Sequence, residues 1–408
     1  MRTGFHRFIQ AVRDLPGALI LPAWAAGLLI VIVGFTGSLV LTVPAAQAAG
    51  LTPAQLSSWV WAIAVGSGVA TLTLALVYRQ PVLTAWSTPG LALLGTSLAS
   101  YRLSEAVGAY IVVGLAIVLL GLSGLFDRAV RFIPQPVALA VLGGLLLKYG
   151  VALFTGIAGA PLIVLAIIAT FLALRKANLR VPIAGALLAG FLAAWATGQL
   201  KLGPIELALA MPVFVWPEFT PGALFGLALP LLVLALASQN LPGFAVMRAA
   251  GYDPPVNGAL VVTGLLSVLL APMLNHGLTM AAITAAIGNA PDAHPDPTKR
   301  YGAAVVAGAL KLLLGLFGVA IVSLLTALPQ PVVTAVAGLA LSGTIAQCLA
   351  GGFGDPEYRD ASLWALLVTA SDVHLLGIGS AFWGFLAGAL IHALLRRPSA
   401  APVVRRAP

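Results

Sequence analysis

Long apolar segments recur from one end of this chain to the other, and the polar stretches between them are short. Only 8% of the 408 residues are charged, whereas 60% are hydrophobic. A soluble domain has roughly 25% charged residues, so this chain has too few charges to cover a surface exposed to water. Lipid must therefore surround most of the protein, and its backbone polar groups must be satisfied within helices.

The apolar pattern predicts an all-α polytopic membrane protein with about fourteen transmembrane segments. The first seven fall at residues 19–44, 57–78, 82–98, 105–125, 137–153, 161–174 and 182–197. The second seven fall at residues 221–239, 259–272, 278–289, 303–325, 332–349, 361–376 and 380–395. Several are shorter than the roughly 20 residues with which a helix crosses the hydrocarbon core. Polar residues, glycine or proline interrupt the third and the tenth, which predicts broken helices there.

Charge placement predicts the orientation of the chain. The N-terminal apolar run, residues 15–43, is too long for the core of a cleavable signal, so we expect a retained first span. With a cytoplasmic N-terminus, all but four of the 21 lysines and arginines fall inside. Arg102 and Lys201 fall outside, Lys148 lies near the outer end of the fifth segment, and Lys311 lies within the eleventh. This asymmetry predicts an inner-membrane protein with both termini in the cytoplasm, and it explains the net charge of +9 without nucleic-acid binding.

Two short sequence matches relate the halves of the chain. Residues 48–53 (AAGLTP) correspond to 249–254 (AAGYDP), and both 134–137 and 329–332 read PQPV, at offsets of 201 and 195 residues. We interpret residues 1–200 and 201–408 as two repeats of seven segments each. Because seven is odd, the second repeat enters the membrane the opposite way round, which is a common transporter plan.

The third segment carries a candidate binding site in the stretch from Thr84 to Gly90. Thr88 followed by Pro89 predicts a helix start, with the threonine hydroxyl capping free amides. A helix N-terminus inside the bilayer attracts a carboxylate, and Trp86 supplies an aromatic wall. The alternative is a kinked, packed helix with Trp86 as an interfacial anchor.

The tenth segment carries the corresponding candidate, residues 275–284. Its polar cluster precedes a helix of small residues, which predicts a second half-helix N-terminus facing the first. His276 is the histidine of this site, and its titration range suits proton transfer. The alternative is a neutral histidine that is hydrogen-bonded to the backbone.

Polar residues elsewhere in the apolar segments give further candidates. Gln239 and Asn240, at the predicted end of the eighth segment, either contact the substrate or stabilise the broken helices. Asp372 and His374 form either a proton relay or a solvated helix end. Lys311 either pairs with a charge in the bilayer or serves a structural role.

Several motifs are missing from the sequence, and their absence argues against other functions. There is no phosphate-binding loop of the type Gly-x-x-x-x-Gly-Lys-Ser/Thr, no His-Glu-x-x-His and no Cys/His cluster. We therefore expect neither an ATP-driven pump nor a membrane metalloprotease, and no metal or cofactor. No charge rings or repeated filter motifs indicate a channel. A secondary transporter is the favoured reading, and a passive channel or a membrane-embedded enzyme are alternatives.

Four motifs resemble hallmarks of the benzoate:proton symporter (BenE-type) family. They are residues 84–90 (TAWSTPG), 237–243 (ASQNLPG), 280–287 (MAAITAAI) and 377–384 (GIGSAFWG). The resemblance runs through nearly the whole chain. It implies the fold of the uracil permeases, with a core domain from segments 1–4 and 8–11, a gate domain from segments 5–7 and 12–14, and short extended stretches and half-helices in segments 3 and 10. It also implies an aromatic monocarboxylate such as benzoate as the substrate, and relatives of this fold often form homodimers.

We therefore expect uptake of benzoate, or a similar acid, with one proton by alternating access. The expected substrate-binding residues are Trp86, Ser87, Thr88, Gly90, Gln239, Asn240, Thr279, Met280 and Thr284. The candidates for proton coupling are His276, Asp372 and His374. A bare anion costs about 2.3 kcal/mol per 100 mV to import against an inside-negative potential, and a co-transported proton removes this cost. Another small organic anion or a nucleobase is the alternative substrate.

Overall fold

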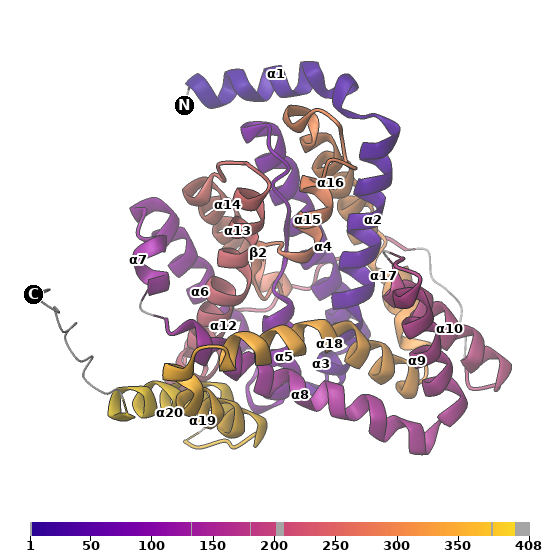
Figure 1. Ribbon diagram of the computed structural model, residues 1–408, viewed down its shortest axis with the longest axis vertical. Helices are drawn as coiled ribbons and strands as arrows, with labels where there is room; N and C mark the ends of the chain where they lie inside the picture. Colours follow the sequence, from indigo (N-terminus) through magenta and orange to yellow (C-terminus); the bar gives the residue numbers. More distant parts are fainter. Residues whose placement is uncertain (1, 132, 180, 201–207, 377, 396–408) are drawn as a thin grey trace, which may run out of the picture.

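The computed structural model describes residues 2–131, 133–179, 181–200, 208–376 and 378–395, which form a helical bundle around one small sheet (Figure 1). The first half contains α1 (Arg2–Ala18), α2 (Leu21–Ser38), α3 (Thr42–Ala48), α4 (Pro53–Tyr78), β1 (Thr84–Trp86), α5 (Thr88–Ser97), α6 (Leu103–Ser123), α7 (Phe126–Arg131), α8 (Gln135–Gly159), α9 (Pro161–Lys176) and α10 (Pro182–Ala196). The second half contains α11 (Pro221–Ala223), α12 (Leu229–Leu234), α13 (Leu241–Ala249), α14 (Val256–Leu270), β2 (Leu278–Met280), α15 (Ile283–Asn289), α16 (Tyr301–Leu316), α17 (Gly318–Thr326), α18 (Gln330–Phe353), α19 (Arg359–Ala370) and α20 (Ser380–Leu395).

The described residues include six helices that are long and apolar enough to cross a membrane, or up to eight if each of two bent pairs is one span. α1 and α2 meet at 101°, and the helical stretch Pro297–Leu316 meets α17 at 71°. The eleventh segment was predicted as one continuous span, and the bend at Phe317 corrects this. The remaining predicted segments are shorter helices, so fourteen crossings stay a prediction.

The eighth segment is longer than the sequence suggested. It runs from Pro221 to Ala249 as one helical stretch of 29 residues. Two π-helical turns, η3 (Leu224–Ala228) and η4 (Ala235–Asn240), lie within it. The consecutive polar side chains of Ser238, Gln239 and Asn240, which follow a long apolar run, predict an end at Gln239. Pro242 instead occupies the first turn of α13, where its missing amide is tolerated.

The third and tenth segments each contain the expected extended stretch followed by a short helix. β1 and β2 pair antiparallel, with Thr84 opposite Met280, Ala85 opposite Thr279 and Trp86 opposite Leu278. The strands are buried, and β2 lies near the centre of the molecule between α4, α13 and α15 (Figure 1). Side chains of neighbouring helices satisfy backbone groups that the strand pairing leaves over: the N–H of Thr84 donates to the Thr71 hydroxyl at 3.2 Å, and the N–H of Leu278 donates to the Ser267 hydroxyl at 2.9 Å.

The helices pack in two groups. In one group α16 packs against α4 and α2, and α14 packs against α6. In the other α18 packs against α8 and α9, and α19 packs against α8 and α20. Lipid-facing leucines such as Leu119 and Leu162 are largely exposed, which suits hydrocarbon surroundings.

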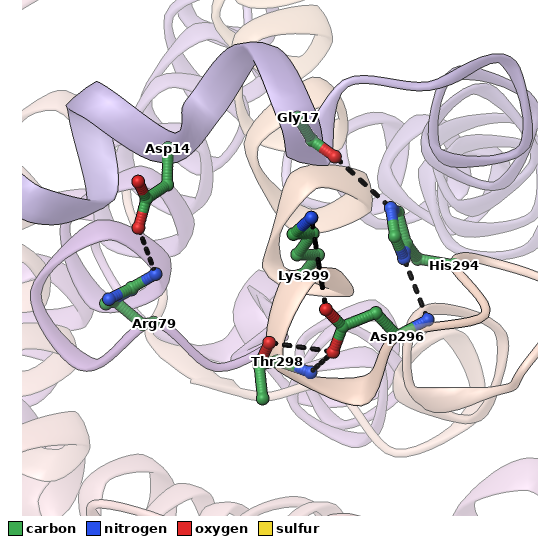
Figure 2. Close-up of polar contacts among 7 residues, drawn as sticks. All are labelled: Asp14, Gly17, Arg79, His294, Asp296, Thr298 and Lys299. Carbon is green, nitrogen blue, oxygen red and sulfur yellow. Dashed lines mark hydrogen bonds and ion pairs between the residues drawn. The ribbon is translucent and has the colours of Figure 1, made fainter.

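Polar contacts hold the N-terminal helix α1 across one end of the bundle (Figures 1 and 2). Asp14 forms an ion pair with Arg79 at the end of α4. His294 contacts the carbonyl oxygen of Gly17 through Nε2 at 3.3 Å, and its Nδ1 accepts the backbone N–H of Asp296 at 3.0 Å. Hydrogen bonds from the hydroxyl and backbone N–H of Thr298 hold the pKa of the Asp296 carboxyl below its ordinary value. These contacts form a polar clamp that ties α1 to α4 and to the loop before α16.

Candidate functional site

A cavity of about 310 Å³ lies between the two helix groups. One side comes from α2, β1, α5, η4, α13, α16 and the start of α15, and the other comes from α8, α10 and α18. The first side contributes Ile30, Val33, Gly34, Phe35, Ala85, Trp86, Thr88, Pro89, Ser238, Gln239, Pro242, Ala281, Ala282, Thr284 and Lys311. The second contributes Leu139, Leu142, Leu146, Ile183, Ala340, Leu341, Thr344, Gln347 and Cys348.

An aromatic pair forms part of the cavity wall. The rings of Phe35 and Trp86 meet edge to face, with centroids 5.1 Å apart and an interplanar angle of 87°. Trp86 is 2% exposed, and its indole N–H has no hydrogen-bond partner among the described residues. A buried donor without a partner is costly, so this N–H is suited to an acceptor that enters the cavity.

The half-helix α5 begins beside this pair, and Ser87 rather than Thr88 caps it. The Ser87 hydroxyl accepts the backbone N–H of Gly90 at 3.0 Å, while Thr88 and Pro89 occupy the first two helical positions. The sequence prediction assigned the cap to Thr88; the structure corrects this by one residue because Ser87 has the extended backbone that a cap requires. Since the N–H of Gly90 is already bonded and Pro89 has none, few amides of α5 remain for a ligand.

His276 stands behind this cap rather than in the cavity wall. Its Nδ1 accepts the indole N–H of Trp59 at 2.9 Å, and its Nε2 lies 3.1 Å from the carbonyl oxygen of Ser87. Because an indole only donates, Nδ1 carries no proton, and the N–H of Nε2 donates to Ser87. His276 is thus a neutral, buried imidazole that links α4 to the start of α5.

The π-helical turn η4 distributes three adjacent polar side chains to two sites. Ser238 and Gln239 line the cavity. The side-chain oxygen of Asn240 turns to β2 and accepts the backbone N–H of Met280 at 3.0 Å. The extra residue of a π-turn changes the direction of the side chains that follow it, which explains how neighbours face different partners.

Lys311 is the charged side chain in the cavity lining. It lies in α16, is 3% exposed, and its Nζ donates to the carbonyl oxygen of Thr84 in β1. The ion pairs of the described residues do not include it. A buried lysine amine therefore lies beside the aromatic pair without a carboxylate partner in the described part of the chain.

The predicted site residues divide into three sets. Trp86, Thr88, Gln239 and Thr284 line the cavity. Ser87, Gly90, Asn240, Thr279, Met280 and His276 lie immediately behind its wall, in or against β1, β2 and α5.

Asp372 and His374 are in neither place. Both are exposed; Asp372 pairs with Lys148 at 3.1 Å, and Nδ1 of His374 contacts the Asp372 carbonyl at 2.9 Å. No group of three or more potential metal ligands occurs among the residues that the structure describes.

Sequence reasoning missed the opposite wall of the cavity. Leu139, Leu142 and Leu146 of α8 resemble any lipid-facing leucines in the sequence, so nothing marked them. Thr344 and Gln347 of α18 did carry a signal, because polar residues three apart share one face of a helix. The two readings of Lys311, a pair with a charge in the bilayer or a structural role, did not include its contact with the carbonyl oxygen of Thr84 in β1, which lies 227 residues away in the chain.

Comparison with known proteins identifies relatives over nearly the whole chain. The family model described as "Benzoate membrane transport protein" (BenE) matches residues 18–394. The inner membrane protein YdcO of Escherichia coli is 42% identical over 374 residues, covering 92% of this chain and 96% of that protein. The benzoate membrane transport protein of Acinetobacter baylyi is 36% identical over 380 residues, covering 93% and 96%.

Solved structures share the fold at low sequence identity. The transmembrane domain of a cyanobacterial bicarbonate transporter, BicA, aligns with a TM-score of 0.55 at 14% identity, covering 90% of this chain and 97% of that one. SLC26A9 aligns with a TM-score of 0.61 at 13% identity, covering 91% of this chain and 64% of that one. At these identities the likeness concerns the fold alone.

Proposed function

Because the chain belongs to the BenE family of benzoate membrane transport proteins, we propose that it imports benzoate, or a similar aromatic monocarboxylate, together with a proton. The observation that carries this proposal is the cavity of about 310 Å³, which joins an aromatic pair to the side chain of one buried lysine. A cavity of about 150 Å³ can hold benzene, so the space suffices for one ring and its carboxylate.

The polar groups of the cavity are arranged to suit a carboxylate. The ring of the substrate packs against Phe35 and Trp86 and against the leucines of α8. The unpaired indole N–H of Trp86 and the ammonium of Lys311 provide donors, and the hydroxyl of Ser238 also lacks a partner among the described residues. Buried donors of this kind discriminate strongly in favour of a ligand that accepts their hydrogen bonds.

We propose alternating access by movement between the two helix groups. We assign the group of α2, α4, α6, α14 and α16 to the core domain expected from segments 1–4 and 8–11. We assign the group of α8, α9, α18, α19 and α20 to the gate domain expected from segments 5–7 and 12–14. The cavity lies at their junction, so relative motion exposes it to one side of the membrane at a time. Fourteen crossings, cytoplasmic termini and a homodimer belong to the same proposal, as does the inner membrane, where YdcO resides by its name.

The position of His276 supports a positioning role. Protonating Nδ1 would place a donor against the indole N–H of Trp59 and break that bond. Asp372 and His374 lie on the exposed surface rather than in the cavity lining, so a direct exchange of protons with bound substrate is not supported there.

Uptake of radiolabelled benzoate into proteoliposomes that contain only this protein tests the function. With an inward proton gradient we expect accumulation above equilibrium, and an uncoupler should abolish it. Empty liposomes with the same gradient control for passive entry of benzoic acid. Equilibration without accumulation would indicate a passive channel. Absence of uptake by folded protein would contradict the proposal, and competition by other small anions or nucleobases would then identify the substrate.

A further inference from the structure

The buried lysine of α16 has an unusual position for a cation inside a membrane. Lys311 is 3% exposed, and its Nζ donates to a backbone carbonyl of β1, next to the cavity. Charged groups at membrane depth are costly, and they commonly mark the path of a substrate or a proton. An unpaired buried charge costs several kcal/mol unless a partner arrives or the group becomes neutral.

The elements packed against α16 offer no partner at this depth. The helices α2, α15 and α17 contain no titratable residue, and α4 contains only Tyr78, at its C-terminal end. α1 contacts the first turn of α16, where the hydroxyl of Tyr301 donates to the carbonyl of Ala11. Across the cavity, α18 contributes Cys348, a buried thiol. Within the described residues, Lys311 therefore has no acidic neighbour that would keep its charge balanced.

Resting on the proposed function, we propose that Lys311 is both the ion-pair partner of the substrate carboxylate and the carrier of the co-transported proton. In the empty cavity the amine is neutral and donates to Thr84. Benzoate and one proton enter together, the proton is taken up by the amine, and an ammonium–carboxylate pair of zero net charge forms. After the cavity opens to the cytoplasm, benzoate leaves and the amine releases the proton. One anion and one proton move per cycle, and the empty carrier returns uncharged.

Two substitutions separate the two roles of Lys311. Lys311→Arg keeps a positive charge that cannot be given up at physiological pH. We expect it to retain exchange of external for internal benzoate at equal pH, but to lose accumulation driven by a pH gradient. Net uptake by this variant should instead respond to an inside-positive potential, because the returning empty carrier is now charged. Lys311→Gln keeps a donor for Thr84 without the charge, and we expect benzoate binding to weaken about tenfold or more.

The matched control is Lys148→Gln, which removes a lysine that pairs with Asp372 outside the cavity. It should behave as the unaltered protein does in both exchange and gradient-driven uptake. Thermal unfolding of each purified variant reports whether it is folded.

Proton uptake on binding provides a readout that a merely structural lysine would not alter. Calorimetry of benzoate binding in buffers of different ionisation enthalpy should give about one proton taken up per benzoate for the unaltered protein and none for Lys311→Gln. This comparison tests whether Lys311 takes up the proton even if Lys311→Arg fails to fold. Gradient-driven accumulation or proton uptake on binding that persists in Lys311→Gln would overturn the inference. Failure of the unaltered protein to transport benzoate would instead overturn the proposed function.

Discussion

The hydrogen bonds of the site distinguish residues that line the cavity from residues that support its wall. Ser87 illustrates the second kind: its hydroxyl caps α5, its carbonyl accepts from His276, and its N–H donates to the carbonyl of Gly277 at 3.2 Å. All of its polar groups are thus committed to protein partners. Its neighbours Trp86 and Thr88 line the cavity instead.

The substitution His276→Gln tests whether His276 supports the site rather than carrying the proton. Glutamine retains an acceptor and a donor but fits the distance from Trp59 to Ser87 less well. We expect uptake to fall several-fold while the pH dependence of uptake stays unchanged. Initial rates at several external pH values measure both quantities. A shift in the pH dependence of uptake would instead indicate that His276 carries the proton.

The residue scale also shows where sequence reasoning succeeds. Pro89 marked the start of a helix, and α5 begins within one residue of the predicted position because proline restricts the first turn so strongly. The identity of the cap was wrong because serine and threonine are chemically alike, and only backbone geometry distinguishes them. The partner of Lys311 was not predictable, since its contact with Thr84 joins residues far apart in the chain.

Among the elements, the strand β2 depends on the close approach of α13. A Cβ atom on Gly243 would lie 2.5 Å from the Cβ of Met280, so α13 packs almost directly on the strand. Broken helices in segments 3 and 10 were predictable from polar and helix-breaking residues. The π-turns of segment 8 were not, because nothing in the local composition distinguishes a π-turn from an α-helical one.

Gly243→Ala should therefore disturb the strand. We expect destabilisation of about 1–3 kcal/mol from overpacking, together with weaker benzoate binding, because β1 pairs with β2 and carries Trp86. Gly343→Ala in α18 is the control, since a Cβ there meets nothing within 4 Å. Thermal unfolding and binding isotherms of both variants measure the effect. Equal behaviour of the two variants would show that α13 and β2 are free to separate.

At the scale of the whole molecule, composition and charge placement predicted a helical membrane protein, and the family resemblance implied the fold. The angle between α1 and α2 and the bend at Phe317 were not predictable, because packing of distant segments sets them. The polar clamp on α1 also consists largely of contacts between residues that are distant in the sequence. Asp14 pairs with Arg79, which lies 65 residues further along the chain.

Breaking this ion pair should have a small effect on stability. The side chains of Arg79 and Asp14 are 26% and 43% exposed, so solvent screens their attraction. A double-mutant cycle with Asp14→Asn and Arg79→Gln should give a coupling energy below about 1 kcal/mol. Thermal unfolding of the four proteins in the same detergent supplies the cycle. A much larger coupling would mean that α1 folds cooperatively with the bundle.

The pairing of β1 with β2 has a consequence for the history of the chain. Each strand meets its hydrogen-bond partner in the opposite half of the sequence. If the two halves descend from one duplicated seven-segment ancestor, that ancestor completed this sheet only by associating with a copy inserted in the opposite orientation in the same membrane. Joining the two copies in one polypeptide fixed their stoichiometry and mutual orientation.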